Sequence, residues 1–254
     1  MESSRSSDAT IPHMSTRPWD IAPSSLAQWA GAAATFAAVV VALFKDSIRE
    51  WWKKPKLKVT CTKEIPETVR VPTTVWQGKW PGGGGGRWNG YSYYVRIKVE
   101  NQGRTRAEKV QVSAMKLAKR GLDNNFAYLP TTLPFSMRWS NGPPTAPVTV
   151  LDGISGRMSA FCDIIALCDP ANPYQRRPAG MPASSAPVTV GQLQMEFDPA
   201  EEWHLLVPGT YRLTLRIGAA NVEPIDRIVE FTHDGRWTEE DIAMRRDYLG
   251  VSLK

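Results

Sequence analysis

The sequence contains few of the residues that build metal centres, disulfide frameworks or catalytic triads. Its 254 residues include three cysteines and three histidines. The cysteines, Cys61, Cys162 and Cys168, have no zinc-ribbon spacing, and their number is odd. Free thiols fit a reducing compartment. These shortages predict a protein without a metal site or a bound cofactor, and we expect no catalytic site.

The residues with chemical potential lack the neighbours that catalysis requires. Neither His204 nor His233 belongs to a G-x-S-x-G or H-E-x-x-H motif. The glycine run at 82–86 lacks the Lys-Ser/Thr pair of a phosphate loop. Asp163 is a carboxylate in an otherwise apolar stretch, and an outward-facing or edge position is its simplest interpretation. A hydrolase that uses the two histidines stays open as a third alternative for function.

Positive charge is concentrated in one short segment. The net charge of the chain is +6, and residues 45–58 alone hold six basic and two acidic side chains. Such a local excess favours a membrane surface with anionic headgroups over nucleic acid. Other basic residues, such as Arg104 and Arg106, are not interleaved with a run of aromatic side chains, as a base-stacking platform would need. We therefore expect no nucleic-acid partner.

One long apolar run lies near the N-terminus. Residues 26–44 read LAQWAGAAATFAAVVVALF, which is 19 residues with one strongly polar member, Gln28. As a helix the run would span roughly 28 Å at about 1.5 Å per residue, which matches the roughly 30 Å hydrocarbon core of a bilayer. A cleaved signal peptide and a buried alanine-rich helix are the alternatives. The long, slightly acidic leader argues against the former, and we predict a single transmembrane helix.

The flanks of the run set the expected domain boundaries. Ser25 and Gln28 have the spacing of a capping box, and Pro55 disfavours helical geometry in the residue before it. We predict a disordered tail over residues 1–24 and a transmembrane helix with a basic, tryptophan-containing extension over residues 25–54. A β domain over residues 55–254 follows.

The charges on either side of the run predict its orientation. The 25 residues before it hold two basic side chains, whereas residues 45–58 hold six. Basic residues favour the cytoplasmic side. We expect a single-pass protein of the bacterial inner membrane with a cytoplasmic C-terminal domain, and an extracytoplasmic domain is the alternative. The predicted membrane-interface residues are Trp29, Arg49, Trp51, Trp52, Lys53 and Lys54.

Small residues recur along the predicted span. They lie three or four positions apart, a spacing that lets two helices approach closely. An alanine-rich segment also produces this pattern by chance, so self-association through the helix stays open as one of two interpretations. The possible helix-association face consists of Ala27, Gly31, Thr35, Ala38 and Ala42.

Beyond Pro55 the apolar period changes from that of a helix to two. Residues 91–100, YSYYVRIKVE, and residues 209–220, GTYRLTLRIGAA, each alternate apolar and polar side chains, as half-buried strands do. About seven such strands without intervening helices predict a mainly β fold, an antiparallel β-sandwich. Residues 238–248 are predicted to form a short terminal helix. Further predicted strands lie at 57–61, 110–114, 146–151, 157–166, 187–197 and 225–232, and predicted long loops at 64–90, 121–147 and 169–186.

Two stretches carry a family resemblance. VENQGRTRAEKVQV at 99–112 resembles the V-x-N-x-G-x-x-x-A-x-x-V hairpin of CARDB-like and related immunoglobulin-like domains, and VPGTYRLTLRI at 207–217 is similar to a late strand of such domains. The whole layout resembles that of bacterial single-pass membrane proteins of undefined function. The resemblance implies an immunoglobulin-like sandwich and no particular activity. Many CARDB-like domains are extracytoplasmic, which supports the alternative orientation.

An anchored sandwich without a catalytic constellation predicts a non-enzymatic function. The leading hypothesis is a membrane-tethered binding or sensing module whose partner is a protein or a small ligand. The alternative is a membrane-active effector, for instance in bacterial defence, whose helix self-associates when the sandwich receives a signal.

Overall fold

A computed structural model describes residues 23–76, 86–131, 134–142, 146–179, 181 and 187–254. The chain divides into two compact units, Met1–Trp52 and Lys53–Lys254, and each is described by itself. The first unit contains one long helix, α1, over Pro23–Lys53. Ala27–Lys45 within it is long and apolar enough to cross a membrane. Of the predicted tail, residues 1–22 lie outside the described residues, and the next two already belong to α1.

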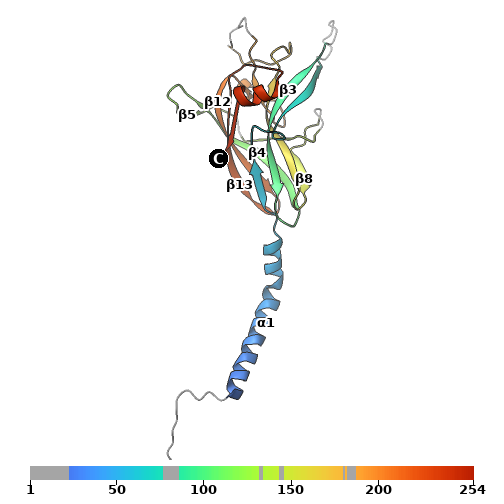
Figure 1. Cartoon of the computed structure of the whole chain (residues 1–254), viewed down its shortest axis with the longest axis vertical. Helices are drawn as coiled ribbons and strands as arrows, with labels where there is room; N and C mark the ends of the chain where they lie inside the picture. The colour runs from blue at the N-terminus through green and yellow to red at the C-terminus, as the bar shows by residue number, and fades with distance from the viewer. Residues whose placement is uncertain (1–22, 77–85, 132–133, 143–145, 180, 182–186) are drawn as a thin grey trace, which may run out of the picture. The chain divides into compact units, whose positions relative to one another are not determined.

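The second unit is a β-sandwich (Figure 1). Its described residues form two antiparallel sheets of seven strands each. Sheet A consists of β1 (Leu57–Thr60), β2 (Thr68–Trp76), β3 (Arg87–Asn101), β7 (Arg138–Trp139), β9 (Ser159–Cys168), β10 (Gly191–Leu193) and β11 (Leu205–Leu206). Sheet B consists of β4 (Ala107–Arg120), β5 (Phe126–Tyr128), β6 (Phe135–Ser136), β8 (Val150–Ile154), β12 (Gly209–Ala219), β13 (Val222–His233) and β14 (Leu249–Leu253).

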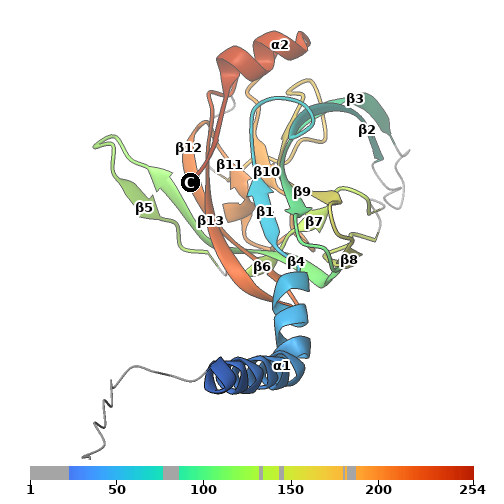
Figure 2. The ribbon, with the colours of Figure 1, turned by 60° about the horizontal axis from the view of Figure 1, so that its bottom comes forward.

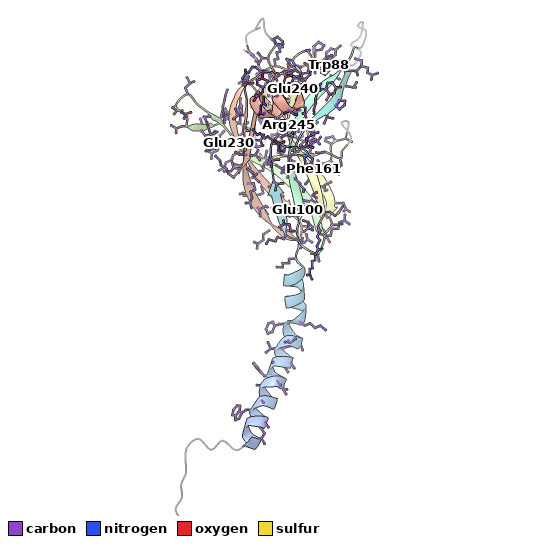
Figure 3. All side chains as sticks on the ribbon, viewed as in Figure 1. Trp88, Glu100, Phe161, Glu230, Glu240 and Arg245 are labelled. Carbon is purple, nitrogen blue, oxygen red and sulfur yellow. The ribbon has the colours of Figure 1, made fainter. Side chains whose placement is uncertain are left out.

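The order of strands places β3 and β9 in the middle of sheet A. β3 pairs with β9 along one edge and with both β1 and β2 along the other, because β1 takes residues 98–101 and β2 takes residues 87–95. In sheet B the order is β14-β13-β12-β4-β5, with β6 and β8 also paired to β4. Figure 2 shows the hairpin of β2 and β3 extending to one side of the sandwich. Trp88 and Glu100 mark opposite ends of β3 in Figure 3.

The core lies between the two sheets. Alternate residues of β3, Tyr93, Val95, Ile97 and Val99, are at most 1 % exposed, as are alternate residues of β12. They pack in one apolar cluster with β4, β9 and β13. The period of two in the sequence therefore identified the buried faces of β3 and β12. Each fully buried aliphatic side chain contributes about 1.5–3 kcal/mol to stability.

Asn101 fastens the start of the β domain to the end of β3. Its side chain is fully buried, and its Oδ1 accepts hydrogen bonds from the backbone N–H groups of Lys56 at 3.1 Å and Gly103 at 3.0 Å. Its Nδ2 donates to the carbonyl oxygens of Thr105 at 2.7 Å and Ile154 at 2.9 Å. One side chain thus satisfies four backbone groups from three segments of the chain, which is what a buried amide requires.

Several predicted boundaries were wrong. Residues 64–90 were predicted as a loop, yet β2 occupies Thr68–Trp76. The strand was missed because it contains Pro72, which argues against a central strand. Among the described strands β2 pairs only with β3, and such an outer strand tolerates proline. Residues 121–147 carry three short strands and the buried Met137 and Trp139. Described residues within 169–186 form no strand, in agreement with the predicted loop.

The predicted short C-terminal helix is confirmed, and a strand that was not predicted follows it. A helical segment begins at Asp241 and continues to Tyr248, with its last five residues in π-type geometry. The chain then adds β14 to the edge of sheet B beside β13. This strand was missed because its five residues follow a helical pattern directly and contain a glycine, which weakens the strand signal.

Candidate functional site

A polar pocket opens on the outer face of sheet A. Its volume is about 320 Å³, and its walls come from β2, β3, β7 and β9 together with the turn after β7. Arg96 on β3 and Asp163 on β9 each lie between two buried neighbours, so the pleat turns both side chains away from the core. The two residues are paired across the strands. The pocket therefore has a charged floor in the centre of a sheet.

Arg96 and Asp163 form an ion pair on this floor. The Nε–H of Arg96 donates to Oδ1 of Asp163 at 2.7 Å, and the side chains are 19 % and 14 % exposed. The hydroxyl of Ser140 donates to the same oxygen at 2.5 Å. Ser140 is itself held by its backbone N–H, which donates to the carbonyl of Phe161 at 2.9 Å. The carboxylate thus has two donors, one from β3 and one from the turn after β7.

Burial governs the electrostatics of the pocket. It raises the pKa of Asp163, and the hydrogen bond from Ser140 and the charge of Arg96 oppose that rise. Burial also raises the pKa of the neighbouring Tyr94, which lines the pocket. The charge on Asp163 is consequently disfavoured by its surroundings and supported by its two partners.

Two arginines beside the pocket, Arg96 and Arg138, have N–H groups that make no hydrogen bond to the described residues. The Nε–H of Arg138 donates to the carbonyl of Met195, and its guanidinium lies 3.9 Å from Asp198. The side chains of Arg96 and Arg138 each make one hydrogen bond to the described residues, and in both arginines the donor is the Nε–H group. A guanidinium carries five N–H donors. Terminal donors of two arginines beside one pocket suit an anionic oxygen, such as a carboxylate or phosphate oxygen.

The described lining of the pocket includes a serine and a carboxylate but no histidine. The hydroxyl of Ser140 points its proton at a carboxylate, and the pocket is not lined by either of the described histidines, His204 and His233. Burial lowers the pKa of His233 to about 4, with the backbone carbonyl of Leu206 opposing, and lowers that of His204 too. Both histidine side chains are fully buried, which disfavours the charged imidazolium. The described residues contain no trio of His, Cys, Asp or Glu with metal-site geometry.

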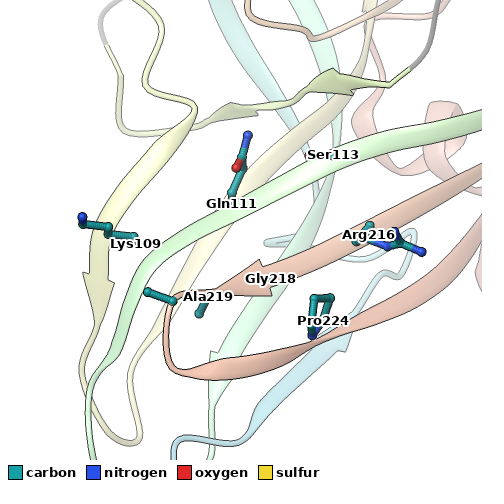
Figure 4. Close-up of a pocket in the computed structure, with 8 residues that line it drawn as sticks. Lys109, Gln111, Ser113, Arg216, Gly218, Ala219 and Pro224 are labelled. Carbon is teal, nitrogen blue, oxygen red and sulfur yellow. The ribbon is translucent and has the colours of Figure 1, made fainter.

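A second pocket lies on the outer face of sheet B (Figure 4). Its volume is about 340 Å³, and β4 and β12 line it. Lys109 and Arg216 lie on opposite sides of it, and Arg216 is occupied by both carboxylate oxygens of Asp226 at 2.8 and 2.9 Å. Gln111 donates to Ser136 at 2.6 Å. Since Arg216 and Gln111 are both bonded to neighbouring side chains, this pocket offers less to a ligand than the pocket on sheet A.

A partly buried polar cluster lies at the terminal helical segment. Arg245 bonds Asp241 at 2.9 Å and Glu64 at 3.2 Å, and Figure 3 shows Arg245 at the same end of the sandwich as Trp88. Tyr93 stacks edge-on against Trp237 with ring centroids 5.3 Å apart. Burial raises the pKa of Tyr93 to about 12, and the neighbouring Asp241 adds to the rise. These contacts attach the terminal segment to sheet A.

The predicted membrane residues all lie at or near α1. Trp29 is 75 % exposed, and Lys54 is exposed just after the helix ends. Arg49, Trp51, Trp52 and Lys53 are helical, but their side chains lie outside the described residues. The small residues Ala27, Gly31, Thr35, Ala38 and Ala42 are all exposed, and the hydroxyl of Thr35 donates to the carbonyl of Gly31 at 2.9 Å.

Sequence reasoning found one member of the polar pocket and missed the others. Asp163 was singled out as a carboxylate in an apolar strand, and it does face outward, but in the middle of the sheet rather than at an edge. Arg96 was placed on the polar face of β3 without a partner. Arg138 and Ser140 lay in a presumed loop, so nothing pointed to them. The glycine run and Trp80 lie outside the described residues, apart from Gly86.

Comparisons with models of protein families, with curated proteins and with solved structures found no match. Function is therefore inferred from the apolar helix α1, the sandwich and the polar pocket.

Proposed function

We propose that this protein is a membrane-tethered, non-enzymatic binding module whose immunoglobulin-like sandwich holds a small anionic ligand in the polar pocket of sheet A. The observation that carries the proposal is the pair of guanidinium groups, Arg96 and Arg138, whose terminal N–H groups make no hydrogen bond to the described residues, beside a pocket lined by one carboxylate that is already bonded. The pocket volume of about 320 Å³ suits a small molecule. Ligand binding rather than catalysis is favoured because the carboxylate oxygen that accepts the hydrogen bond of Ser140 is also bonded to Arg96, and neither described histidine lines the pocket.

A ligand that binds the folded state should raise the melting temperature of the full-length protein in detergent. The probes are succinate and inorganic phosphate, measured against chloride at matched ionic strength. At a hundredfold excess over Kd the stabilisation is about 2.7 kcal/mol, which for a domain of this size corresponds to about 5–10 °C. The rise should disappear in R138Q.

R212Q is the matched control. Arg212 also lies on an outward sheet face and donates through Nε to a carboxylate, that of Glu230 at 2.9 Å. Its substitution should leave the ligand-induced rise intact. The proposal would be abandoned if neither probe raises the melting temperature above the chloride value, or if R138Q responds as the wild type does.

We further propose that the anchor lies in the bacterial inner membrane with the sandwich in the cytoplasm. The support is the apolar window Ala27–Lys45 and the six basic side chains of residues 45–58 that follow it. A green fluorescent protein fused after Lys254 should fluoresce in the membrane fraction, and an alkaline phosphatase fused there should be inactive. Replacing those six basic residues with serine should weaken this bias. An active phosphatase fusion in the wild type would reverse the orientation and favour envelope ligands.

A further inference from the structure

Three segments meet at the end of the sandwich where the chain enters it. Gln102 donates its backbone N–H to the carbonyl of Lys56 at 2.8 Å, Arg157 donates to the carbonyl of Asn101 at 2.6 Å, and Asn101 donates to the carbonyl of Met158 at 2.9 Å. Residues 54–56, 102–106 and 152–158 therefore form one surface, which we name the basic end. Glu100, at the adjoining end of β3, marks its place in Figure 3.

The loops of the basic end are held in place by close backbone packing. A Cβ atom on Gly103 would lie 2.5 Å from the carbonyl oxygen of Lys54, and one on Gly156 would lie 2.7 Å from that of Arg104. Only glycine permits such approaches. Asn101 lies beneath the same loops and bonds four of their backbone groups. The side chains that project from these loops are therefore presented from a fixed base.

The basic end carries a strong local charge. Its three segments contain five cations and one carboxylate, Asp152, so the net charge is +4. Asp152 is paired with Arg106 at 2.5 Å. Each of the other four cations is exposed and has no ion pair or hydrogen bond from its side chain to the described residues. These four are Lys54, Lys56, Arg104 and Arg157.

An exposed apolar side chain lies among these charges. Met158 is 60 % exposed and adjoins Arg157. An exposed, flexible apolar side chain beside cations is the combination that interfacial protein surfaces use, since the methionine enters the headgroup layer while the cations meet phosphate groups. A surface that binds duplex or single-stranded nucleic acid would instead offer aromatic rings for stacking, and the basic end has none.

The chain itself brings the basic end to a membrane. The apolar window ends at Lys45, nine residues before Lys54. Nine residues extend to about 32 Å at most and to about 13 Å as a helix, and α1 remains helical to Lys53. A positive surface tethered so near a bilayer meets anionic headgroups at high effective concentration.

We propose that the basic end is a second membrane contact, through which the sandwich docks on anionic lipid headgroups by means of Lys54, Lys56, Arg104, Arg157 and the inserted Met158. Docking at this end fixes the sandwich upright on the membrane. Arg96 lies five residues before Asn101 on β3, roughly 16 Å along the strand, so the polar pocket stays clear of the headgroups.

The test uses the full-length protein in lipid nanodiscs with a fluorophore at residue 155 in S155C. Cys61 and Cys162 are buried, and the less buried Cys168 is replaced by serine. Quenching by spin-labelled lipid should occur in phosphatidylcholine discs that contain phosphatidylglycerol, be weak without it, and decline with rising ionic strength.

Removing two cations should release the sandwich. The variant R104S/R157N should lower the ratio of docked to undocked protein about 30-fold, since each cation near an anionic surface contributes about 1 kcal/mol. Asparagine is chosen at position 157 because Arg157 has a φ of 64°, which asparagine tolerates. K54S/K56S should do the same through a different segment. R177S/R227S removes two exposed arginines elsewhere and should change nothing.

Equal quenching with and without phosphatidylglycerol would overturn the proposal, as would equal losses in the control and in the two basic-end variants. Binding of a labelled oligonucleotide that the basic-end variants abolish, with no lipid quenching, would replace it with a nucleic-acid surface. None of these outcomes depends on the ligand of the polar pocket, which the melting experiment tests separately.

Discussion

Replacing Asn101 with alanine is expected to lower the free energy of unfolding by about 3–5 kcal/mol. The substitution leaves two backbone N–H groups and two carbonyls without their partner at a fully buried position. Each buried polar group without a partner costs about 1–3 kcal/mol, and water that enters the space reduces the sum. Because domains are stable by about 5–15 kcal/mol, N101A should populate unfolded protein well below the wild-type melting temperature.

N221A is the matched control for this experiment. Asn221 also accepts from one backbone N–H, that of Glu108 at 3.0 Å, and donates to one carbonyl, that of Arg106 at 2.9 Å. It is exposed, so water replaces the lost bonds and we expect a cost below about 1 kcal/mol. Urea unfolding of the full-length protein in detergent, followed by near-ultraviolet circular dichroism, measures both. Equal costs would show that Asn101 is not the fastening point of the β domain.

The long strands could be predicted because apolar and polar residues alternate along them, and this local pattern shows which face is buried. β3 and β12 alternate over more than eight residues, and each buries one face against the other sheet. The turn around Asn101 was recognised from its residues as well, but the predicted hairpin was wrong, because β3 lies in sheet A and β4 lies in sheet B. The resemblance placed Asn101 and Gly103 in a turn, but it did not indicate that the asparagine bonds segments more than forty residues away.

The missed elements depend on partners far away in the sequence. β7 is two residues long, and its strand geometry exists because Arg138 and Trp139 pair with β9. β2 contains a proline, which local propensity penalises, yet β3 supplies nine paired residues. Tertiary pairing thus overrode local preference in both cases. A short strand of this kind has no period long enough to detect.

The polar pocket could not be predicted from the sequence either, because its residues come from segments that are far apart in the chain. The partners of Asp163 are Arg96, 67 positions earlier, and Ser140, 23 positions earlier. Only the register between β3 and β9 brings Arg96 opposite Asp163, and an irregularity in that register lies immediately before Arg96. Alternation predicts the face on which a side chain lies, whereas the cross-strand neighbour follows from a register that one sequence does not reveal.

Removing Arg96 is expected to be far more damaging than neutralising Asp163. In R96L the carboxylate of Asp163 keeps only Ser140 as a direct donor, and breaking an ion pair at a buried position costs about 3–5 kcal/mol. Since the pair is 19 % and 14 % exposed, we expect about 2–4 kcal/mol. D163N keeps an oxygen for Arg96 and Ser140 and removes the charge that burial disfavours, so its cost should be below about 1 kcal/mol.

The double variant and the pH dependence identify the cause. R96L/D163N should be more stable than R96L, because no unpaired charge remains.

Burial raises the pKa of Asp163 in the folded protein while Arg96 opposes the rise, so R96L should raise it further. A carboxyl with a raised folded pKa binds more protons when folded, and its destabilising effect grows as pH rises through that pKa. The deficit of R96L relative to wild type should therefore shrink on acidification, and that of R96L/D163N should not. A deficit of R96L that is independent of pH and unrelieved by D163N would mean that Arg96 acts through packing rather than through its charge.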